Sequence, residues 1–435
     1  MCYPYIEHMF AFKERTLMYN YYLCPKREIF CIDQKSFFAS VSCLMNGWDP
    51  KTTYLAVVGD IEEKGSVVLA ATPKMKEIGI KTGSRHFEIP KADHIKVINP
   101  SMKTYLTYSK KITEIALQYV APEDFHQYSI DEFFMDVTDS YHLFAETPYE
   151  LAEILKAHIY RETLIECAIG IGDNVLLSKV SLDIEAKKMP NGITEWRYHD
   201  IPEKLWPISP LRNFFGINKR SEKKLNQRGI FTVKDLALYP VEYLKKDFGV
   251  IGIDWHMHAN GIDFSRLSEK YNAKSPTIAK SQILMRDYEF HELYVVILEH
   301  VDEVVHRLRL MNRFARTIQF QVTTKYGKSY RQQFTIDEGT HDENEVMFGI
   351  WIRLKKIADE SALYRTISVS LTNLISNKYI QGNLFKENDE KREQLLKTID
   401  ELKIKYGTLS VMRALSMTEA STLKLREGLI AGHKR

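Results

Sequence analysis

The sequence predicts a multidomain protein of the α+β class whose first part is a catalytic unit. Its 435 residues exceed what one hydrophobic core usually organises, so several domains are expected. Strand-like and helix-like patterns alternate over roughly the first 200 residues, and acidic residues sit beside two of the strand-like runs. A β-α-β-β-α-β order of patterns follows later in the chain and indicates a second sheet with its own helices.

The first region justifies the alternating order element by element. Strands are expected over 28–32, 54–58, 66–71 and 167–171, with 54–58 and 66–71 forming a hairpin around an acidic, glycine-containing turn. Helices are expected over 37–44, 74–78, 105–119 and 149–162. The segment 125–137 has apolar runs flanking an acidic pair, which predicts a strand or a hairpin.

Prolines near residue 200 mark the end of this region. Helices are then expected over 220–227, capped by Gly229, and over 233–238, started by Thr232, with a tight turn at 215–218. A second boundary is expected at 271–276. Beyond it the pattern predicts a split βαβ sheet with both helices on one face: strands over 281–285, 317–324, 329–336 and 366–374, and helices over 292–311 and 344–357.

Composition excludes some classes of protein. Hydrophobic residues make up 44% and charged residues 27%, as in ordinary globular proteins. No apolar run approaches the roughly 20 residues that span a bilayer, and the N-terminus does not resemble a signal peptide, so we expect a cytoplasmic protein without membrane contact. The five scattered cysteines favour reduced thiols, and Cys31, in an apolar run, is expected to be a buried one.

Positive charge is concentrated in two stretches, although the net charge is only +3. Residues 304–336 contain no acidic residue, and residues 212–228 contain one, Glu222. Such stretches suit a partner with a phosphate backbone, but solvated helix and strand faces explain either stretch alone equally well.

Three carboxylates carry the chemistry: Asp33, Asp131 and Glu132. Mg²⁺ prefers oxygen ligands from a few carboxylates together with substrate phosphates. Two such ions can hold the attacking and leaving oxygens of a phosphoryl transfer. A single aspartate would more often lie in a solvated turn. The set of three, each beside apolar strand-like residues, instead predicts a nucleotidyl-transfer site.

Three ordered motifs connect these residues to a family. Residues 33–41 (DQKSFFASV) resemble the first catalytic motif of the Y-family, or translesion, DNA polymerases, and 129–132 (SIDE) match the second letter for letter. Residues 168–179, followed by 190–192 (PNG), resemble the third. The resemblance covers about residues 27–376 and is closest to the bacterial UmuC-like branch.

The resemblance implies the fold of a right-hand polymerase. Its expected parts are an N-terminal extension (1–26), a palm (27–44 and 96–200), fingers (45–95), a helix-hairpin-helix thumb (201–270), a little finger (276–376) and a C-terminal tail (377–435).

It also implies roles in the active site. Asp33 and Asp131 would bridge two Mg²⁺ ions, Glu132 would complete the site, and the backbone carbonyl of Gln34 is a further candidate ligand. Phe38 matches the steric gate that leaves no room for a 2′-hydroxyl on the incoming deoxyribonucleoside triphosphate. Its neighbour Phe37 is also a candidate nucleotide contact, with a place in the core as the alternative.

The resemblance also places lysines at the triphosphate. Lys76 and Lys179 match positions of this kind, and Lys187 and Lys188 are both candidates for a further one. Lys35 and Pro73 depart from the family pattern, where many members have a second acid and a triphosphate-contacting tyrosine.

Contacts with primer–template DNA are implied for the thumb turn and the little finger. In the thumb, Asn218 replaces a usual glycine, and because asparagine tolerates left-handed backbone angles we expect the turn to survive. The expected DNA-binding residues are Gly216, Asn218, Lys219, Lys280, Arg286, Arg316, Lys325 and Arg331.

A pentapeptide in the polar segment after residue 376 resembles the Q-x-x-L-F peptide by which bacterial polymerases bind the sliding clamp. Its candidate contacts are Gln381, Leu384 and Phe385. An apolar pair in a polar segment has no core to join and suits a pocket on a partner. The expected partners are therefore the sliding clamp, primer–template DNA and nucleotides, and the resemblance leaves room for accessory subunits.

Together these features predict a template-directed DNA polymerase for damaged templates. No second carboxylate cluster suggests a proofreading exonuclease, so low fidelity is expected. Two alternatives stay open. A nucleotide cyclase on the same palm would need neither thumb nor clamp peptide, and a DNA- and clamp-binding factor that has lost activity would be consistent with Lys35 and Pro73.

Overall fold

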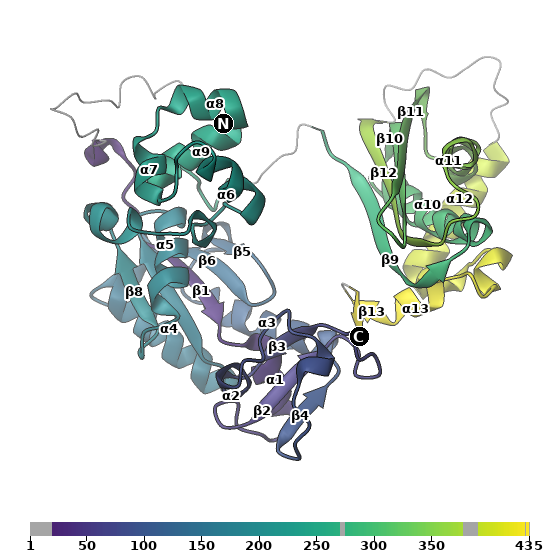
Figure 1. Ribbon diagram of the computed structural model, residues 1–435. Helices are drawn as coiled ribbons and strands as arrows, with labels where there is room; N and C mark the ends of the chain where they lie inside the picture. Colours follow the sequence, from purple (N-terminus) through teal and green to yellow (C-terminus); the bar gives the residue numbers. More distant parts are fainter. Residues whose placement is uncertain (1–19, 270–274, 377–389, 431, 435) are drawn as a thin grey trace. The chain divides into compact units, whose positions relative to one another are not determined.

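The computed structural model describes residues 20–269, 275–376, 390–430 and 432–434 (Figure 1). The chain divides into two compact units, with the division between residues 270 and 271. Residues 433 and 434 group with the first unit.

The first unit is organised by a five-stranded sheet of order β5-β6-β1-β7-β8. Its strands are β1 (Ile29–Gln34), β5 (Phe125–Gln127), β6 (Glu132–Asp136), β7 (Cys167–Gly172) and β8 (Ile193–Trp196). β1 pairs antiparallel with β6 and with β7. Its residues 29–32 are fully buried, as expected for a central strand covered on both faces. The expected strand 28–32 is therefore confirmed, and it continues through Asp33.

Two helices pack on this sheet: α4 (Pro148–Thr163), and α5 (Val175–Ser181), which is directly followed by a π-helical turn (Leu182–Ala186). Two further helices of this unit are α1 (Phe37–Met45), which packs on the smaller sheet described next, and α3 (Met102–Ala116), which contacts α1 and α4. A Cβ atom on Gly170 or Gly172 would clash with the backbone of Ser178. The two glycines of β7 thus let α5 pack closely on β7 and β1.

A smaller three-stranded sheet of order β3-β2-β4 lies between α1 and α3 in the sequence. Its strands are β2 (Tyr54–Val58), β3 (Val68–Ala71) and β4 (Ile95–Ile98), with the short helix α2 (Pro73–Glu77) after β3. The predicted hairpin is confirmed, since β2 and β3 are antiparallel. The sequence did not reveal β4, which pairs parallel to β2.

Four helices complete the first unit: α6 (Lys219–Asn226), α7 (Val233–Leu238), α8 (Val241–Phe248) and α9 (Val250–Ala259). α7 has the predicted bounds because Thr232 and Asp235 form a capping box. The turn before α6 forms as expected, but not because Asn218 adopts a left-handed backbone angle. Asn218 has an extended backbone (φ −95°) and its side chain caps α6, while Gly216 takes the left-handed angle (φ +86°).

The second unit contains a four-stranded sheet of order β11-β10-β12-β9 with two helices. Its elements are β9 (Ile278–Tyr288), α10 (Leu293–Leu310), β10 (Arg313–Thr324), β11 (Ser329–Thr340), α11 (Glu343–Ile357) and β12 (Tyr364–Ser376). All neighbouring strands are antiparallel, so β9 and β10 run parallel with β12 between them. The predicted split βαβ arrangement is confirmed, and α10 and α11 pack on each other over the core.

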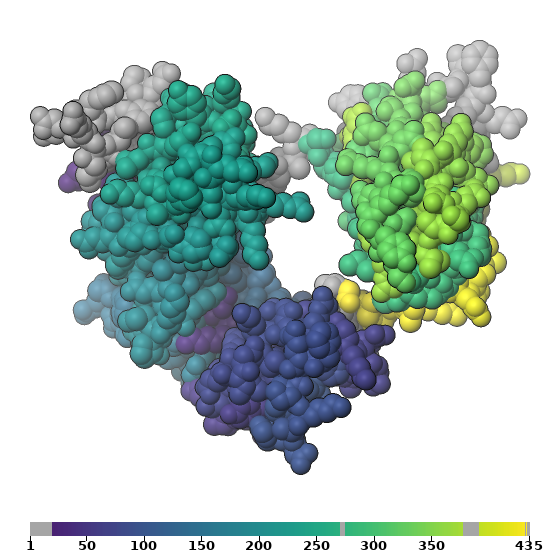
Figure 2. All heavy atoms as spheres, viewed as in Figure 1, coloured from purple at the N-terminus to yellow at the C-terminus, as the bar shows by residue number. Residues whose placement is uncertain are grey.

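A C-terminal segment belongs to this second unit as well. It contains α12 (Glu390–Tyr406), α13 (Leu423–Glu427) and β13 (Leu429–Ile430), and β14 (His433–Lys434) follows. Figure 2 shows the yellow C-terminal residues lying against the green body of the unit. Ion pairs hold them there: Asp400 with Arg309, Arg413 with Asp302 and Glu343, and Arg426 with Glu299 and Glu303. The unit thus extends beyond residue 376, the expected end of the little finger.

The described residues bear on the expectations for the cysteines and for membrane-spanning helices. Cys24, Cys31, Cys43 and Cys167 are all unpaired and buried, so the buried thiol predicted at Cys31 is confirmed. No helix in the described ranges combines the length and apolar character needed to cross a bilayer.

Candidate active site

Two of the three predicted carboxylates lie on neighbouring strands of the five-stranded sheet, and the third directly precedes one of these strands. Asp33 near the end of β1 is the register partner of Glu132 at the start of β6. Asp131 immediately precedes β6, and its carbonyl accepts a hydrogen bond of 2.9 Å from the Gln34 amide. Strand pairing therefore brings together residues that are about a hundred positions apart, cross-strand partners having Cβ atoms roughly 5 Å apart.

Two lysines connect these acids through a fourth carboxylate. Lys179 Nζ lies 2.7 Å from Glu132 Oε1 and 3.0 Å from Asp183 Oδ2. Lys187 Nζ lies 2.8 Å from Asp183 Oδ1 and 3.0 Å from Asp33 Oδ2. The result is a line of alternating charges from Glu132 to Asp33, which we call the charge relay: Glu132, Lys179, Asp183, Lys187 and Asp33.

One short helical segment, which includes the π-helical turn, supplies three members of the charge relay. Lys179 is in α5, and both lysines are separated from Asp183 by four residues. π-helical turns are rare and recur at functional sites, because the extra residue redirects the side chains that follow. Here the turn carries Asp183 between the two ammonium groups.

Burial and neighbouring charge shift the pKa values of these groups. Burial raises the pKa of Asp33 to about 6; Lys187 opposes this rise, and Asp131 and Glu132 add to it. Burial disfavours the charged form of Lys179, but Glu132 and Asp183 outweigh it and hold the pKa of Lys179 above its ordinary value. Lys179 is therefore a permanent cation beneath the acids.

The donor set suits a hard divalent cation in its chemistry. Asp33, Asp131 and Glu132 offer only carboxylate oxygens, and Asp33 keeps a fifth of its side-chain surface exposed. Each carboxylate is already paired with a side chain of the protein. Asp33 forms an ion pair with Lys187 and Glu132 with Lys179, and Asp131 accepts a hydrogen bond of 2.6 Å from Ser129 Oγ. Accordingly, no group of three metal-ligating side chains converges within the described residues. These side chains would hold a cation after exchanging those partners.

An aromatic pair positions Phe38. Its ring stacks on Tyr105 with centroids 4.3 Å apart and planes 9° apart. The Tyr105 hydroxyl is in turn 2.8 Å from Ser42 Oγ. Phe38 is partly exposed, whereas Phe37 is 2% exposed and belongs to the core. Burial thus assigns Phe37 to the core and leaves Phe38 as the accessible ring of the two candidate nucleotide contacts.

The structure separates the candidate lysines. Lys76 Nζ donates to Ser36 Oγ at 2.8 Å, and its pKa is lowered by burial despite the favourable charge of Asp33. Lys187 contacts Asp33, as described above. Lys188 forms no ion pair within the described part of the chain and is exposed.

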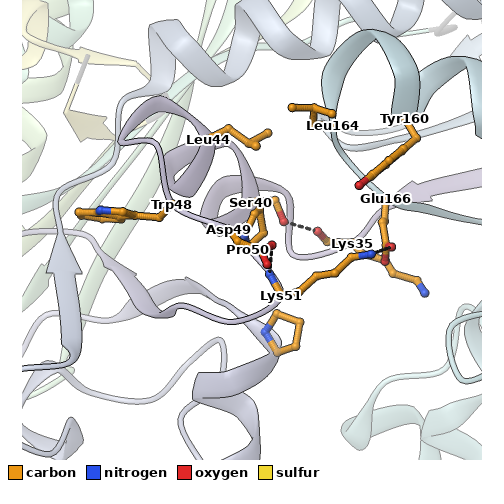
Figure 3. A pocket seen from close by; sticks show the side chains of 11 residues that line it. Lys35, Ser40, Leu44, Trp48, Asp49, Pro50, Lys51, Tyr160, Leu164 and Glu166 are labelled. Carbon is orange, nitrogen blue, oxygen red and sulfur yellow. Dashed lines mark hydrogen bonds and ion pairs between the residues drawn. The ribbon is translucent and has the colours of Figure 1, made fainter.

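The two departures from the family pattern, Lys35 and Pro73, line one pocket of about 250 Å³ (Figure 3). Trp48, Tyr160 and the ion pair of Lys51 with Glu166 also line it. Lys51 first, and then Lys35, hold the pKa of Glu166 below its ordinary value. The charge of Lys35 is therefore offset by an acid outside the charge relay.

The predicted DNA-binding cations fall into two groups. Three have acidic partners: Lys280 with Glu303, Arg286 with Glu292, and Lys325 with Asp287. Register places Lys280 opposite the buried Val369, on the side of the sheet that faces the helices.

The other predicted cations are better placed for a partner. Arg331 lies opposite Gln321 on the face away from the helices, and Arg316 lies where the register of β10 shifts. In the first unit, Gly216 and Asn218 form the exposed turn before α6, and Lys219 is the first residue of that helix. The clamp-peptide residues Gln381, Leu384 and Phe385 lie outside the described residues.

The sequence did not single out Asp183 or Tyr105. Asp183 had a readable signal, since it lies four residues from each of two candidate lysines. Tyr105 had none, because its contact with Phe38 joins helices that lie far apart in the sequence.

Comparisons with known proteins agree on one family. The model of the impB/mucB/samB family matches residues 32–183, and the model of its C-terminal domain matches residues 275–384. UvrX of Bacillus subtilis (strain 168), provisionally described as a UV-damage repair protein, is 40% identical over 96% of this chain and 100% of its own. DNA polymerase IV 2 of the same organism is 34% identical over 94% of this chain and 100% of its own.

A solved structure gives the fold. A Dbh–Dpo4–Dbh chimera of Y-family DNA polymerases superposes with a TM-score of 0.62, at 20% identity, over 80% of this chain and 100% of its own. The likeness supports a right-hand fold with a palm in the first unit and a little finger in the second. Since both family models and relatives matched along nearly their whole length agree, this chain belongs to the impB/mucB/samB family of Y-family DNA polymerases.

Proposed function

We propose that this lesion-bypass DNA polymerase adds deoxyribonucleotides to a primer 3′ end at the charge relay, with two Mg²⁺ ions as cofactors. Asp33 and Asp131 would bridge the ions, and Glu132 and the Gln34 carbonyl would complete the ligand set. The register pairing of Asp33 with Glu132, next to Asp131, is the observation that carries this proposal. Bound divalent ions supply charge neutralisation for phosphoryl transfer.

The surrounding side chains would handle the nucleotide. Lys76 and Lys187 present ammonium groups beside Asp33, where the charge of a triphosphate would be neutralised. Lys179 is 8% exposed in its side chain and paired with Glu132, so its part would be to hold that carboxylate. Phe38, fixed by Tyr105, would lie beneath the sugar.

DNA would be held through its phosphates, without base reading, as bypass of damaged templates requires. The exposed turn of Gly216, Asn218 and Lys219 is one contact. The other contact is the face of the little finger away from its helices, with Arg331, the hydroxyl and amide side chains around it, and Arg316. Lys280, Arg286 and Lys325 would have to leave their acids to take part.

A primer-extension assay tests this function. The intact protein should extend a primer opposite normal and damaged template bases when Mg²⁺ is present. Chelation should stop extension, and returning Mg²⁺ should restore it. An Asp131→Ala/Glu132→Ala protein purified in parallel controls for contaminating polymerases. Absence of extension by the pure, folded protein would instead favour the DNA- and clamp-binding factor. The named relatives already weigh against a cyclase.

Replacing Phe38 with alanine should raise ribonucleotide incorporation. Without the ring, the space beneath the sugar admits a 2′-hydroxyl, and we expect the preference for deoxyribonucleotides to fall by about a hundredfold, or roughly 3 kcal/mol. The measurement is the ratio of kcat/KM for paired deoxy- and ribonucleotides. Phe37→Leu, a core change next to the gate, is the matched control. Unchanged sugar selection in Phe38→Ala would remove the gate assignment.

We also propose that the peptide containing Gln381, Leu384 and Phe385 binds a bacterial sliding clamp. Leu384→Ala/Phe385→Ala should weaken clamp binding at least about tenfold, because two apolar anchors leave their pocket. Surface plasmon resonance on immobilised clamp measures the effect. Asn383→Ala, within the same peptide but outside its anchors, should bind as the wild type does. Equal binding by the double variant would refute the proposal.

A further inference from the structure

The charge relay contains two lysine ammonium groups beside the carboxylates that are proposed to bind metal. Lys187 occupies Asp33 and Lys179 occupies Glu132, two of the proposed metal ligands. Asp183 binds both ammonium groups, one with each carboxylate oxygen. Within the described residues, Asp183 is the sole acid paired with both lysines, and it is not among the proposed metal ligands.

The two lysines differ in their freedom to move. Lys179 is 8% exposed in its side chain, so Glu132 and Asp183 confine it. The side chain of Lys187 is 35% exposed, and its ammonium group lies at the end of a flexible four-carbon stem. Lys187 is therefore the member of the charge relay that can leave its partner when another cation takes Asp33.

We propose that Lys187 is an internal counter-cation that competes with the catalytic divalent cation for Asp33, and that Asp183 is the positioning residue that retains Lys187 when it leaves. In the absence of metal, Lys187 neutralises Asp33. When Asp33 ligates a cation, Lys187 stays within reach of Asp183, with its charge available to the nucleotide's phosphates. No bond forms or breaks; ion pairs are exchanged.

The position of Asp183 supports this role. Asp183 lies four residues after Lys179 and four before Lys187, so one helical face carries all three side chains, and each carboxylate oxygen faces one lysine. A side chain that stabilised only the helix would need one such partner. The second contact, to Lys187, is the one that matters after Lys187 leaves Asp33.

Binding of Mn²⁺ to the full-length protein, without DNA or nucleotide, tests the inference, and electron paramagnetic resonance measures it. Lys187→Met should bind Mn²⁺ about tenfold more tightly, since a competing unit charge next to Asp33 is removed. Asp183→Asn should bind roughly fivefold more weakly, because Lys187 then pairs with Asp33 alone. Asp183→Glu should restore most of the affinity.

The double variant Asp183→Asn/Lys187→Met separates positioning from a general field effect. If Asp183 acts through Lys187, its replacement should change Mn²⁺ affinity less than about twofold in the Lys187→Met background. An equal, additive effect in both backgrounds would overturn the inference. Lys110→Met, which removes an exposed lysine of α3 paired with Glu114, controls for the loss of one positive charge.

The inference rests on the proposed ligand set, and the same titration distinguishes the two. If Mn²⁺ binding survives in Asp131→Ala/Glu132→Ala, the ligand set is wrong. If that variant loses Mn²⁺ while Lys187→Met binds it as the wild type does, the ligand set stands and the counter-cation role is refuted.

Discussion

Replacement of Asp33 by asparagine is expected to lower kcat/KM for nucleotide addition by about a thousandfold or more while making the metal-free protein more stable. The loss would follow because a neutral amide cannot replace the carboxylate that we propose as a ligand of the divalent cations, an effect worth several kcal/mol. Primer extension under single-turnover conditions measures it.

The gain in stability follows from the raised pKa of Asp33, which burial brings to about 6. The folded protein then binds this proton more tightly than the unfolded chain, whose aspartate has a pKa near 4. The free energy of unfolding therefore falls as the pH rises from about 4 to about 6 and stays low above that. Asparagine avoids the charged form, so at neutral pH it should recover about 2 kcal/mol.

Thermal unfolding in a chelator measures this gain. The transition of the first unit should move up by a few degrees in Asp33→Asn at pH 7.5, and the difference from wild type should shrink toward pH 4. Metal affinity in the wild type should decline as the pH falls through about 6, since a proton then occupies Asp33. An inactive variant that is also less stable at neutral pH would show that Asp33 has a structural role instead.

Replacement of Arg426 by methionine is expected to destabilise the second unit by about 3 kcal/mol. Arg426 approaches Glu299 at 3.3 Å, and the side chain of Glu299 is 1% exposed. Without the arginine, a buried carboxylate keeps only the hydroxyl groups of Ser421 and Thr422 and one backbone amide. Denaturant unfolding followed by hydrogen exchange in β9 and α10 measures the change.

Two companion variants test that cause. Lys424→Met removes a positive charge from the same helix α13, at an exposed position, and should leave stability nearly unchanged. Glu299→Gln/Arg426→Met removes both members of the ion pair and should regain much of the loss, because no unpaired charge stays buried. A double variant as unstable as Arg426→Met would assign the effect to packing.

The sequence predicted elements best where a local signal set their bounds. The helix Val233–Leu238 begins at a capping box, and the strand Ile29–Gln34 begins with a continuous apolar run of four residues. β4 (Ile95–Ile98) escaped because it is short and none of its residues is buried, so no periodicity stands out. The C-terminal segment escaped because its docking charges, such as Asp400 and Arg413, look like those of a solvated helix.

In the candidate site, too, local motifs were readable from the sequence, whereas side-chain pairings were not. Asp33, Asp131 and Glu132 could be grouped as candidates from the sequence because each lies in a short motif. Whether a lysine is free or paired depends on register and side-chain reach, which the sequence does not display. Thus Lys280 faces Glu303 on the helix side of its sheet, while Arg331 lies on the open face.

The π-helical turn (Leu182–Ala186) makes the active site sensitive to chain length as well as to residue identity. One residue fewer would let α5 continue with α-helical geometry, and every later side chain in that helix would rotate by about 100°. Lys187 would then turn away from Asp33 although no residue of the charge relay had changed. Deletions between β7 and β8 should consequently be rarer among functional variants than substitutions there, a ratio that deep mutational scanning would count directly.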